Sequence, residues 1–222
     1  MSYRKTPIAV NEVYHVFNQS VAKQPIFISN QDYRRALDVL RFYQYRNPSL
    51  RFSFYNRLSI SQKEEFFSRL ILSAEKLVEI ICFCLMPNHV HFLLKNLREN
   101  GISRFMSNFQ NSYAKYFNTR ISRVGSVFRQ NFKAVRIESE EQLLHVSRYI
   151  HLNPVSSFLI EVKDLKTYPW SSYPPYLTQG ETWIQKELIL AHFKSVEHYK
   201  QFILDQVDYQ RKLEIIKHLT FE

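Results

Sequence analysis

The hydrophobic and polar positions of the chain follow two spacings, and together they predict eight regular elements before about residue 160. Four segments carry apolar side chains at alternating positions or in short unbroken runs, which predicts strands at about 12–20, 78–85, 89–95 and 127–137. Four others carry apolar side chains every three or four residues, which predicts helices at about 30–46, 61–76, 101–120 and 139–153. Four strands flanked by helices on one side indicate an α+β fold built on an antiparallel sheet.

Local signals predict where several of these elements begin and end. Ser61 followed by Glu64 is a candidate capping box for the second helix. Pro87 and Asn88 favour a tight turn, because proline lacks an amide donor and asparagine tolerates turn geometry, so the two middle strands are expected to form a hairpin. Pro154 is expected to end the last of the four helices at the residue before it.

The net positive charge of the chain indicates a negatively charged partner. Its 222 residues include 30 Lys and Arg against 20 Asp and Glu, which gives a net charge of +10. The segment from Arg98 to Glu138 holds +6 of this charge together with many Phe and Tyr side chains. Basic groups pair with phosphates and aromatic rings stack on unpaired bases, so this segment predicts binding of single-stranded nucleic acid. The alternative is that the aromatic rings belong to the core and the charges form a solvated face.

Composition excludes several other classes. Apolar residues make up 45% of the chain and only 3 residues are glycine, which excludes disorder and collagen-like repeats. No segment approaches the about 20 apolar residues of a membrane-spanning helix, and the N-terminus lacks the apolar stretch of a signal peptide. Two cysteines are too few for a secreted disulfide scaffold. We therefore expect a soluble, cytoplasmic protein with no membrane partner.

The sharpest local signal is the run MPNHVH at 86–91. Side chains alternate between the two faces of a strand, so His89 and His91 point the same way, with their α-carbons about 6.5–7 Å apart. Two imidazoles in that relation can converge on one divalent ion. A structural role for both is the alternative. A second alternative is a zinc site that adds the thiols of Cys82 and Cys84, although structural zinc sites favour two to four residues between their cysteines.

A second signal lies on the helix expected at 139–153. Positions four apart share one face of a helix, so Tyr149 and Asn153 lie side by side and offer a phenol and an amide oxygen. His145 and His151 are further polar groups nearby. The alternative is that Tyr149 packs at an interface and Asn153 only ends the helix before the proline.

In combination, the two signals, their order and the basic segment between them resemble a known family. The residues that carry the resemblance span about three quarters of the chain: YHV at 14–16, MPNHVH at 86–91, GISRFM at 101–106, YFN at 116–118, FRQNFK at 128–133, YIHLNPV at 149–155 and WSSY at 170–173. Together they are similar to the REP-associated tyrosine transposases, also described as IS200-like transposases, of the HUH single-tyrosine transposase family. The absence of a second tyrosine one turn from Tyr149 favours this family over the two-tyrosine replication initiators.

The resemblance implies a domain organisation. It implies a ferredoxin-like antiparallel sheet with helices on one face, within a nuclease domain over residues 1–158. A helical insertion at about 47–76 belongs to this domain. Residues 159–222 are expected to form a C-terminal extension that is loop-rich and then helical.

The resemblance also implies a reaction. Tyr149 maps to the nucleophile, and His89, His91 and Asn153 map to the ligands of a divalent metal ion, Mg²⁺ or Mn²⁺. The reaction is cleavage of single-stranded DNA through a 5′-phosphotyrosine intermediate, later reversed by strand transfer. The targets are palindromic repeats that fold as hairpins, so we expect a cytoplasmic enzyme that acts on nucleoid-associated DNA, as a monomer or a homodimer.

Basic residues in and beside the positively charged segment are the expected DNA contacts. They are Arg104, Lys115, Arg120, Arg123, Arg129, Lys133 and Arg148. Because tyrosine has an unperturbed pKa of about 10, a nearby metal or a cation such as Arg148 or Lys133 is expected to favour the phenolate of Tyr149.

Alternatives to this assignment remain at the level of sequence. Tyr113 and Tyr116 are rival nucleophiles, since both lie on a helix in a basic setting. A non-catalytic nucleic-acid-binding regulator of the same fold is the alternative function. An RNA-processing protein with a ferredoxin-like fold is a third possibility.

Overall fold

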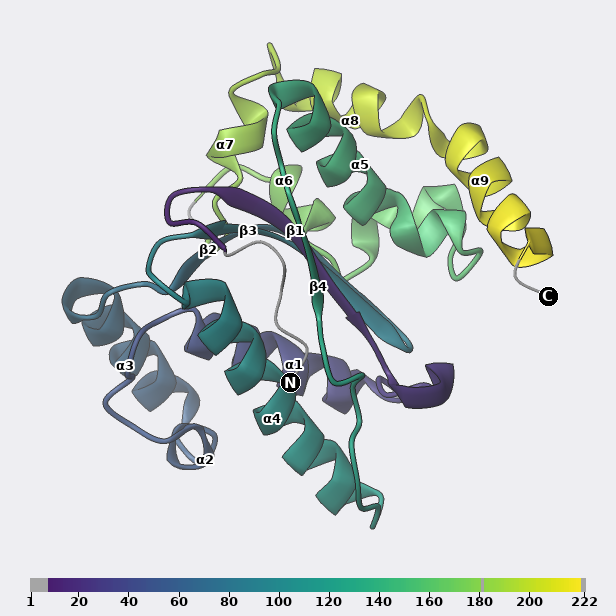
Figure 1. The fold of residues 1–222 in the computed structure, drawn as a ribbon. Coiled ribbons are helices and arrows are strands. Elements are labelled where there is room, and N and C mark those ends of the chain that lie inside the picture. The colour runs from purple at the N-terminus through teal and green to yellow at the C-terminus, as the bar shows by residue number, and fades with distance from the viewer. Residues whose placement is uncertain (1–7, 181, 221–222) are drawn as a thin grey trace.

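Four antiparallel strands form one sheet in the computed structural model, which describes residues 8–180 and 182–220 (Figure 1). The strands are β1 (Val13–Gln19), β2 (Val78–Met86), β3 (His89–Asn96) and β4 (Lys133–Arg136). Their order across the sheet is β2-β3-β1-β4, and each neighbouring pair is antiparallel. β1 is therefore parallel to β2 with β3 between them, and β3 is parallel to β4 with β1 between them. Two such split units, each joined by a helical crossover, make the ferredoxin-like arrangement expected from the sequence.

The two crossover helices, α1 (Asn30–Tyr43) and α4 (Gly101–Arg120), cover one face of the sheet (Figure 1). The ring of Phe92 on β3 points to this face and meets the rings of Phe105 and Phe109 on α4 edge to face. All three rings are fully buried, so burial of apolar surface holds α4 against the sheet. Because side chains alternate along β3, the same packing turns the two histidines of the MPNHVH run to the other face.

Helix α5 (Glu140–Ser156) lies on the opposite face of the sheet and packs against β2 and β3 (Figure 1). The α+β fold is confirmed, but the expectation that the helices lie on one face is wrong for α5. The physical reason is that α1 and α4 already cover the first face. The chain leaves the edge strand β4 and buries the apolar side of α5 against the face that remains.

The chain after α5 packs beside that helix and along the outer edge of β2. Its elements are η2 (Val162–Thr167), α6 (Tyr173–Tyr176), α7 (Glu187–Leu190), α8 (Val196–Leu204) and α9 (Val207–Thr220). Leu85 donates a backbone hydrogen bond to the Trp170 carbonyl, and Ser172 donates one to the Phe83 carbonyl. These bonds satisfy backbone groups of β2 that an open sheet edge would leave exposed.

Before β2 the chain also forms η1 (Val21–Lys23), α2 (Phe52–Tyr55) and α3 (Ile60–Ser73). Aromatic side chains join α2 and α3 to α1. The Phe42 ring stacks on Phe66 at 5.7 Å and meets Phe52 edge to face at 5.1 Å, centroid to centroid. This packing fixes α2 beside α1 and α4, as Figure 1 shows.

Two of the predicted starts and ends differ from the structure at helix α3 and strand β4. The capping box of α3 is Ser59 with Gln62, so the helix begins at Ile60 rather than after Ser61. β4 is shorter than the strand expected at 127–137, because only its four residues pair continuously with β1. The residues just before β4 contribute only an isolated bridge to Ser20.

Helix α5 also runs further than expected, through Pro154 to Ser156. A proline inside a helix removes one backbone hydrogen bond. Here Val155 is fully buried, and the Ser157 amide donates to the Asn153 carbonyl, so packing and a closing hydrogen bond retain the last turn. None of the helices in the described part of the chain combines the length and the apolar character needed to cross a membrane.

Candidate active site

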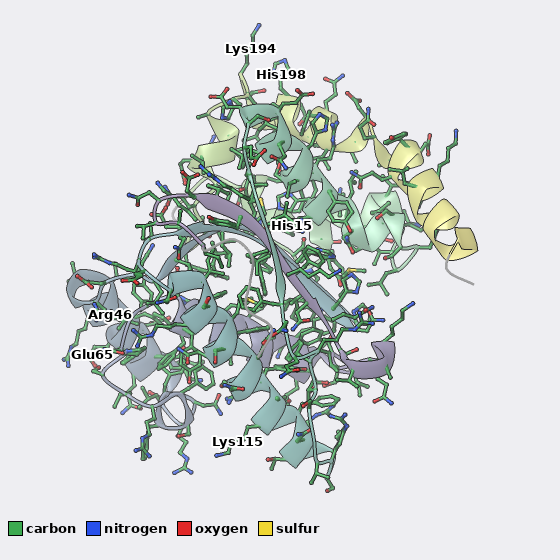
Figure 2. The ribbon with its side chains drawn as sticks, in the orientation of Figure 1. His15, Arg46, Glu65, Lys115, Lys194 and His198 are labelled. Atoms are coloured by element: carbon green, nitrogen blue, oxygen red, sulfur yellow. The ribbon has the colours of Figure 1, made fainter. Side chains whose placement is uncertain are left out.

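The face of the sheet beneath α5 gathers three histidines. Alternation along β3 places His89 and His91 on this face, and pairing with β1 sets Phe17 opposite His91. His15, two residues before Phe17, shares the face and lies at the centre of the sheet (Figure 2). Its Nε2 is 3.0 Å from Nδ1 of His91, and the two rings stack with centroids 5.2 Å apart. Sequence reasoning did not assign His15 to the site, because the register between β1 and β3 decides its position.

Helix α5 presents Tyr149 to this cluster. The Tyr149 ring lies 5.3 Å from the His91 ring and nearly perpendicular to it, at 89°. It lies 5.8 Å from the His15 ring at 73°, so both contacts are edge-on. The structure therefore brings the proposed nucleophile against the paired histidines, and it does so because α5 lies on the histidine face.

Asn153, one helical turn beyond Tyr149, meets the other histidine of β3. Its Oδ1 is 3.3 Å from Nε2 of His89. The Asn88 amide donates to the Lys23 carbonyl, which directs the Asn88 Oδ1 toward Nδ1 of His89 at 2.6 Å. Each ring nitrogen of His89 therefore faces a side-chain amide oxygen, and a neutral ring carries its proton on only one of them. With the proton on Nδ1, the Nε2 lone pair and the Asn153 oxygen are arranged as two ligands of one cation.

The donor set fits a divalent cation. Two ligands that bind one ion at right angles, each about 2.1 Å from it, lie about 3 Å apart. The distance from His89 Nε2 to Asn153 Oδ1 is 3.3 Å, and the His91 ring lies 5.0 Å from the His89 ring. Two imidazoles and an amide oxygen leave positions for phosphate oxygens and water, as a catalytic ion requires. Within residues 8–180 and 182–220, no three His, Cys, Asp or Glu side chains group closely enough to hold a metal by themselves.

Burial keeps His15, which contacts the candidate ligand His91, uncharged. Burial lowers the pKa of His15 to about 4, so its imidazole is neutral at neutral pH. His91 and Asn153 are only 6% and 5% exposed. A neutral His15 therefore orients the His91 ring through the hydrogen bond between them without adding a positive charge. We regard His15 as a positioning residue.

A cavity of about 270 Å³ opens beside the two histidines of β3. Arg129 and Lys133, two of the predicted DNA contacts, line it together with Phe17. The Lys133 Nζ lies 5.9 Å from the centre of the Phe17 ring. No acidic side chain is among the described residues that line the cavity. Its charge therefore favours an anion such as a phosphate group.

Three other predicted DNA contacts lie away from Tyr149. Arg104 and Lys115 are exposed on α4, which covers the other face of the sheet; Figure 2 labels Lys115 there. Arg123 donates to the Ser126 carbonyl and so helps to hold its own loop. The structure does not bring these three residues to the histidine cluster.

The structure does not bring Arg148, the last of the predicted DNA contacts, to the histidine cluster. Arg148 is 6% exposed, and its guanidinium donates to the Phe202 carbonyl and stacks 4.0 Å above the Phe202 ring. Its Nη2 is also 2.6 Å from Nδ1 of His145. The physical reason is that positions 145 and 148 lie on the side of α5 that faces α8, whereas position 149 faces the sheet.

Arg120 and both rival tyrosines have buried partners on the other side of the sheet. Asp32 is fully buried, pairs with Arg120 at 2.9 Å and accepts a hydrogen bond from the Tyr116 hydroxyl at 3.0 Å. Burial and the neighbouring Asp32 raise the pKa of Tyr116 to about 12. The Tyr113 hydroxyl donates to the Ile26 carbonyl, and burial raises the pKa of Tyr113 further. Both phenols thus have structural partners on the α4 face and lie far from the histidines.

His151 lies on a third side of α5. Its Nδ1 is 2.7 Å from the Tyr199 hydroxyl and its Nε2 is 2.7 Å from Ser172 Oγ. Burial lowers the pKa of His151 to about 3, so the ring is neutral. It therefore ties α5 to α8 and to the segment along β2, and it does not face Tyr149.

The two cysteines do not form the zinc site considered from the sequence. Both are fully buried, and burial raises the pKa of Cys82 to about 12 and that of Cys84 further. The Cys82 sulfur is 3.3 Å from the Tyr176 hydroxyl, and the Cys84 sulfur is 3.6 Å from that of Met86. Thiols that stay protonated among such partners behave as small apolar side chains.

Comparisons with known proteins find a likeness to transposases. The sequence profile of the family described as "Transposase IS200 like" matches residues 49–153. A search of curated proteins gives no match. A REP-associated tyrosine transposase bound to a REP hairpin is similar in structure at 15% identity, over 82% of this chain and 92% of that chain, with a TM-score of 0.49. A transposase candidate from Deinococcus radiodurans is similar at 15% identity, over 67% of this chain and 95% of that chain, with a TM-score of 0.36.

The matched residues include the paired histidines, the tyrosine and the asparagine of the candidate site. Transposases are a class of DNA-processing enzyme. Residues 49–153, a little under half of the chain, match the profile of the IS200-like transposase family that the motifs resemble.

Proposed function

We propose that this protein is a metal-dependent single-stranded DNA endonuclease and strand transferase that uses Tyr149 as its nucleophile. The observation that carries the proposal is the edge-on contact of Tyr149 with His91, one helical turn from the contact of Asn153 with His89. Nucleophile, candidate metal ligands and a basic cavity are then neighbours. The hairpin-forming palindromic substrate rests on the resemblance of the motifs to those of REP-associated transposases.

In the proposed reaction the phenolic oxygen of Tyr149 attacks the phosphorus of a DNA phosphodiester. A bond forms between that oxygen and phosphorus, and the bond from phosphorus to the 3′ oxygen breaks. The phenol loses its proton and the departing 3′ oxygen gains one, which leaves a 5′-phosphotyrosine and a free 3′-hydroxyl. Attack by a 3′-hydroxyl on the phosphotyrosine reverses these changes, rejoins the strand and restores the phenol.

The residues around Tyr149 have separate parts in this reaction. His89, His91 and Asn153 would hold Mg²⁺ or Mn²⁺, which when bound withdraws charge from a non-bridging phosphate oxygen. Burial of His91 and Asn153 limits the access of bulk water to the reacting atoms. The positive charges of Arg129 and Lys133 draw the phosphate into the adjoining cavity.

The test is incubation with Mn²⁺ and single-stranded oligonucleotides that span genomic palindromes, followed by a denaturing gel. The wild-type protein is expected to form a covalent DNA adduct that Tyr149→Phe abolishes. Tyr209→Phe is the matched control, because Tyr209 is 60% exposed on α9, and it should leave the adduct intact. Hairpin binding without any adduct would instead identify a non-catalytic regulator, and a preference for RNA without an adduct would identify an RNA-processing protein.

A further inference from the structure

A wide groove lies between α1, α2 and α4, on the other side of the sheet from Tyr149. Its volume is about 910 Å³, and five basic residues line it: Arg35, Arg51, Arg57, Lys115 and Arg120. Side-chain amides and hydroxyls form most of the remaining polar lining, and no acidic side chain is among the described residues that line it. We call it the α2–α4 groove.

The basic residues of the α2–α4 groove differ in how they are held. The Arg35 guanidinium lies 4.1 Å from the centre of the Phe52 ring and 5.3 Å from that of Tyr116, so two aromatic rings fix its orientation. Arg51 and Lys115 are exposed, as is Arg57. Arg120 is balanced by its buried acidic partner. The groove thus presents one fixed cation and three solvent-facing ones to an anion.

The α2–α4 groove is connected to the candidate active site. A third cavity, of about 580 Å³, lies between α4 and β4. It shares Asn131 and Lys133 with the cavity beside His89 and His91, and it shares Asn111 with the α2–α4 groove. Through these shared residues the three cavities follow one another around the edge strand β4, a series that we call the track. No acidic side chain is among the described residues that line any of them.

We infer that the α2–α4 groove binds the phosphate backbone of the same DNA that is cleaved at Tyr149. This inference rests on the proposed function and extends it, since it anchors the substrate at a distance from the reacting phosphate. A strand that follows the track meets basic, polar and apolar side chains and, among the described lining residues, no acidic one. Each phosphate contact releases bound counterions, which increases affinity without reading sequence. The groove also gives Lys115 a place in DNA binding although it lies far from the histidines.

The test removes the three solvent-facing cations of the groove together, by Arg51→Gln, Arg57→Gln and Lys115→Gln. Affinity for a hairpin with a long single-stranded flank is measured across salt concentrations in a Tyr149→Phe background, so binding is scored without cleavage. Loss of three single-strand phosphate contacts should make the slope of log affinity against log salt shallower by about 2. At 0.15 M salt the affinity should fall on the order of 50-fold.

The matched control removes the same charge elsewhere, by Lys163→Gln, Lys166→Gln and Lys194→Gln, which are exposed and do not line the groove. Its salt slope should remain that of the parent protein. Equal slopes for the groove variant and the control would overturn the inference. Failure of the proposed chemistry would show separately, as no Tyr149 adduct with the groove result unchanged.

Discussion

Replacing Arg120 by Gln is expected to lower the stability of the protein, because Arg120 balances a buried charge. Asp32 is fully buried at the start of α1, where it accepts hydrogen bonds from the Ser29 amide and hydroxyl and from the Tyr116 hydroxyl. Arg120 Nη2 lies 2.9 Å from the same carboxylate. Glutamine at position 120 removes the positive charge and leaves the carboxylate buried with its neutral donors.

The magnitude follows from the burial of each partner. Removing one partner of a buried ion pair costs about 3–5 kcal/mol. Two features reduce that cost here: the Arg120 side chain is 29% exposed, and Asp32 keeps the hydrogen bonds from Ser29 and Tyr116. We therefore expect a loss of about 2–3 kcal/mol in the free energy of unfolding. For a chain of this size, that lowers the melting temperature by about 4–12 °C.

Urea denaturation followed by circular dichroism measures this loss as a shift of the midpoint at constant slope. Lys115→Gln is the matched control, because Lys115 is exposed on the same helix, and it should change stability by less than about 0.5 kcal/mol. An Arg120→Gln protein with wild-type stability would refute the reasoning. If that protein also bound DNA with a shallower salt slope, Arg120 would be a DNA contact, as first expected from the sequence.

Three further changes test the site and its support. His91→Ala should abolish the covalent adduct, and removal of metal by EDTA should do the same. Affinity of the variant for the hairpin, measured in a mobility-shift assay, should stay within about threefold of wild type, and retained cleavage would remove the metal assignment. His15→Phe should slow single-turnover adduct formation by at least about tenfold and raise the Mn²⁺ concentration required, since His91 loses its partner, and wild-type values for both would argue against a positioning role. Gly101→Ala should lower thermal stability by about 2 kcal/mol, because an added Cβ would lie 2.4 Å from the Leu77 carbonyl oxygen and 2.6 Å from Asn96 Oδ1. A gain in stability, which helix propensity alone predicts, would contradict that steric argument.

Features that depend on neighbouring residues could be predicted from the sequence. The i, i+2 spacing sets His89 and His91 on one face of a strand, and the i, i+4 spacing sets Tyr149 and Asn153 on one side of a helix. The hairpin at Pro87 likewise depends only on adjacent residues. Where two local signals compete, the sequence does not rank them. Ser59 with Gln62 and Ser61 with Glu64 both match the pattern of a capping box, and only the first pair forms one.

Features that depend on docking were decided by the tertiary structure. The β1–β3 register places His15 against His91, and the choice of sheet face for α5 brings Tyr149 to both. The same docking turns Arg148 toward α8, and it leaves Lys133 and Arg129 as the predicted cations beside the histidines. Bond geometry and the repeats of strand and helix determine which side chains of one element share a direction. Which elements face each other depends on the burial of apolar surface summed over the whole chain, and no short stretch of sequence contains that sum.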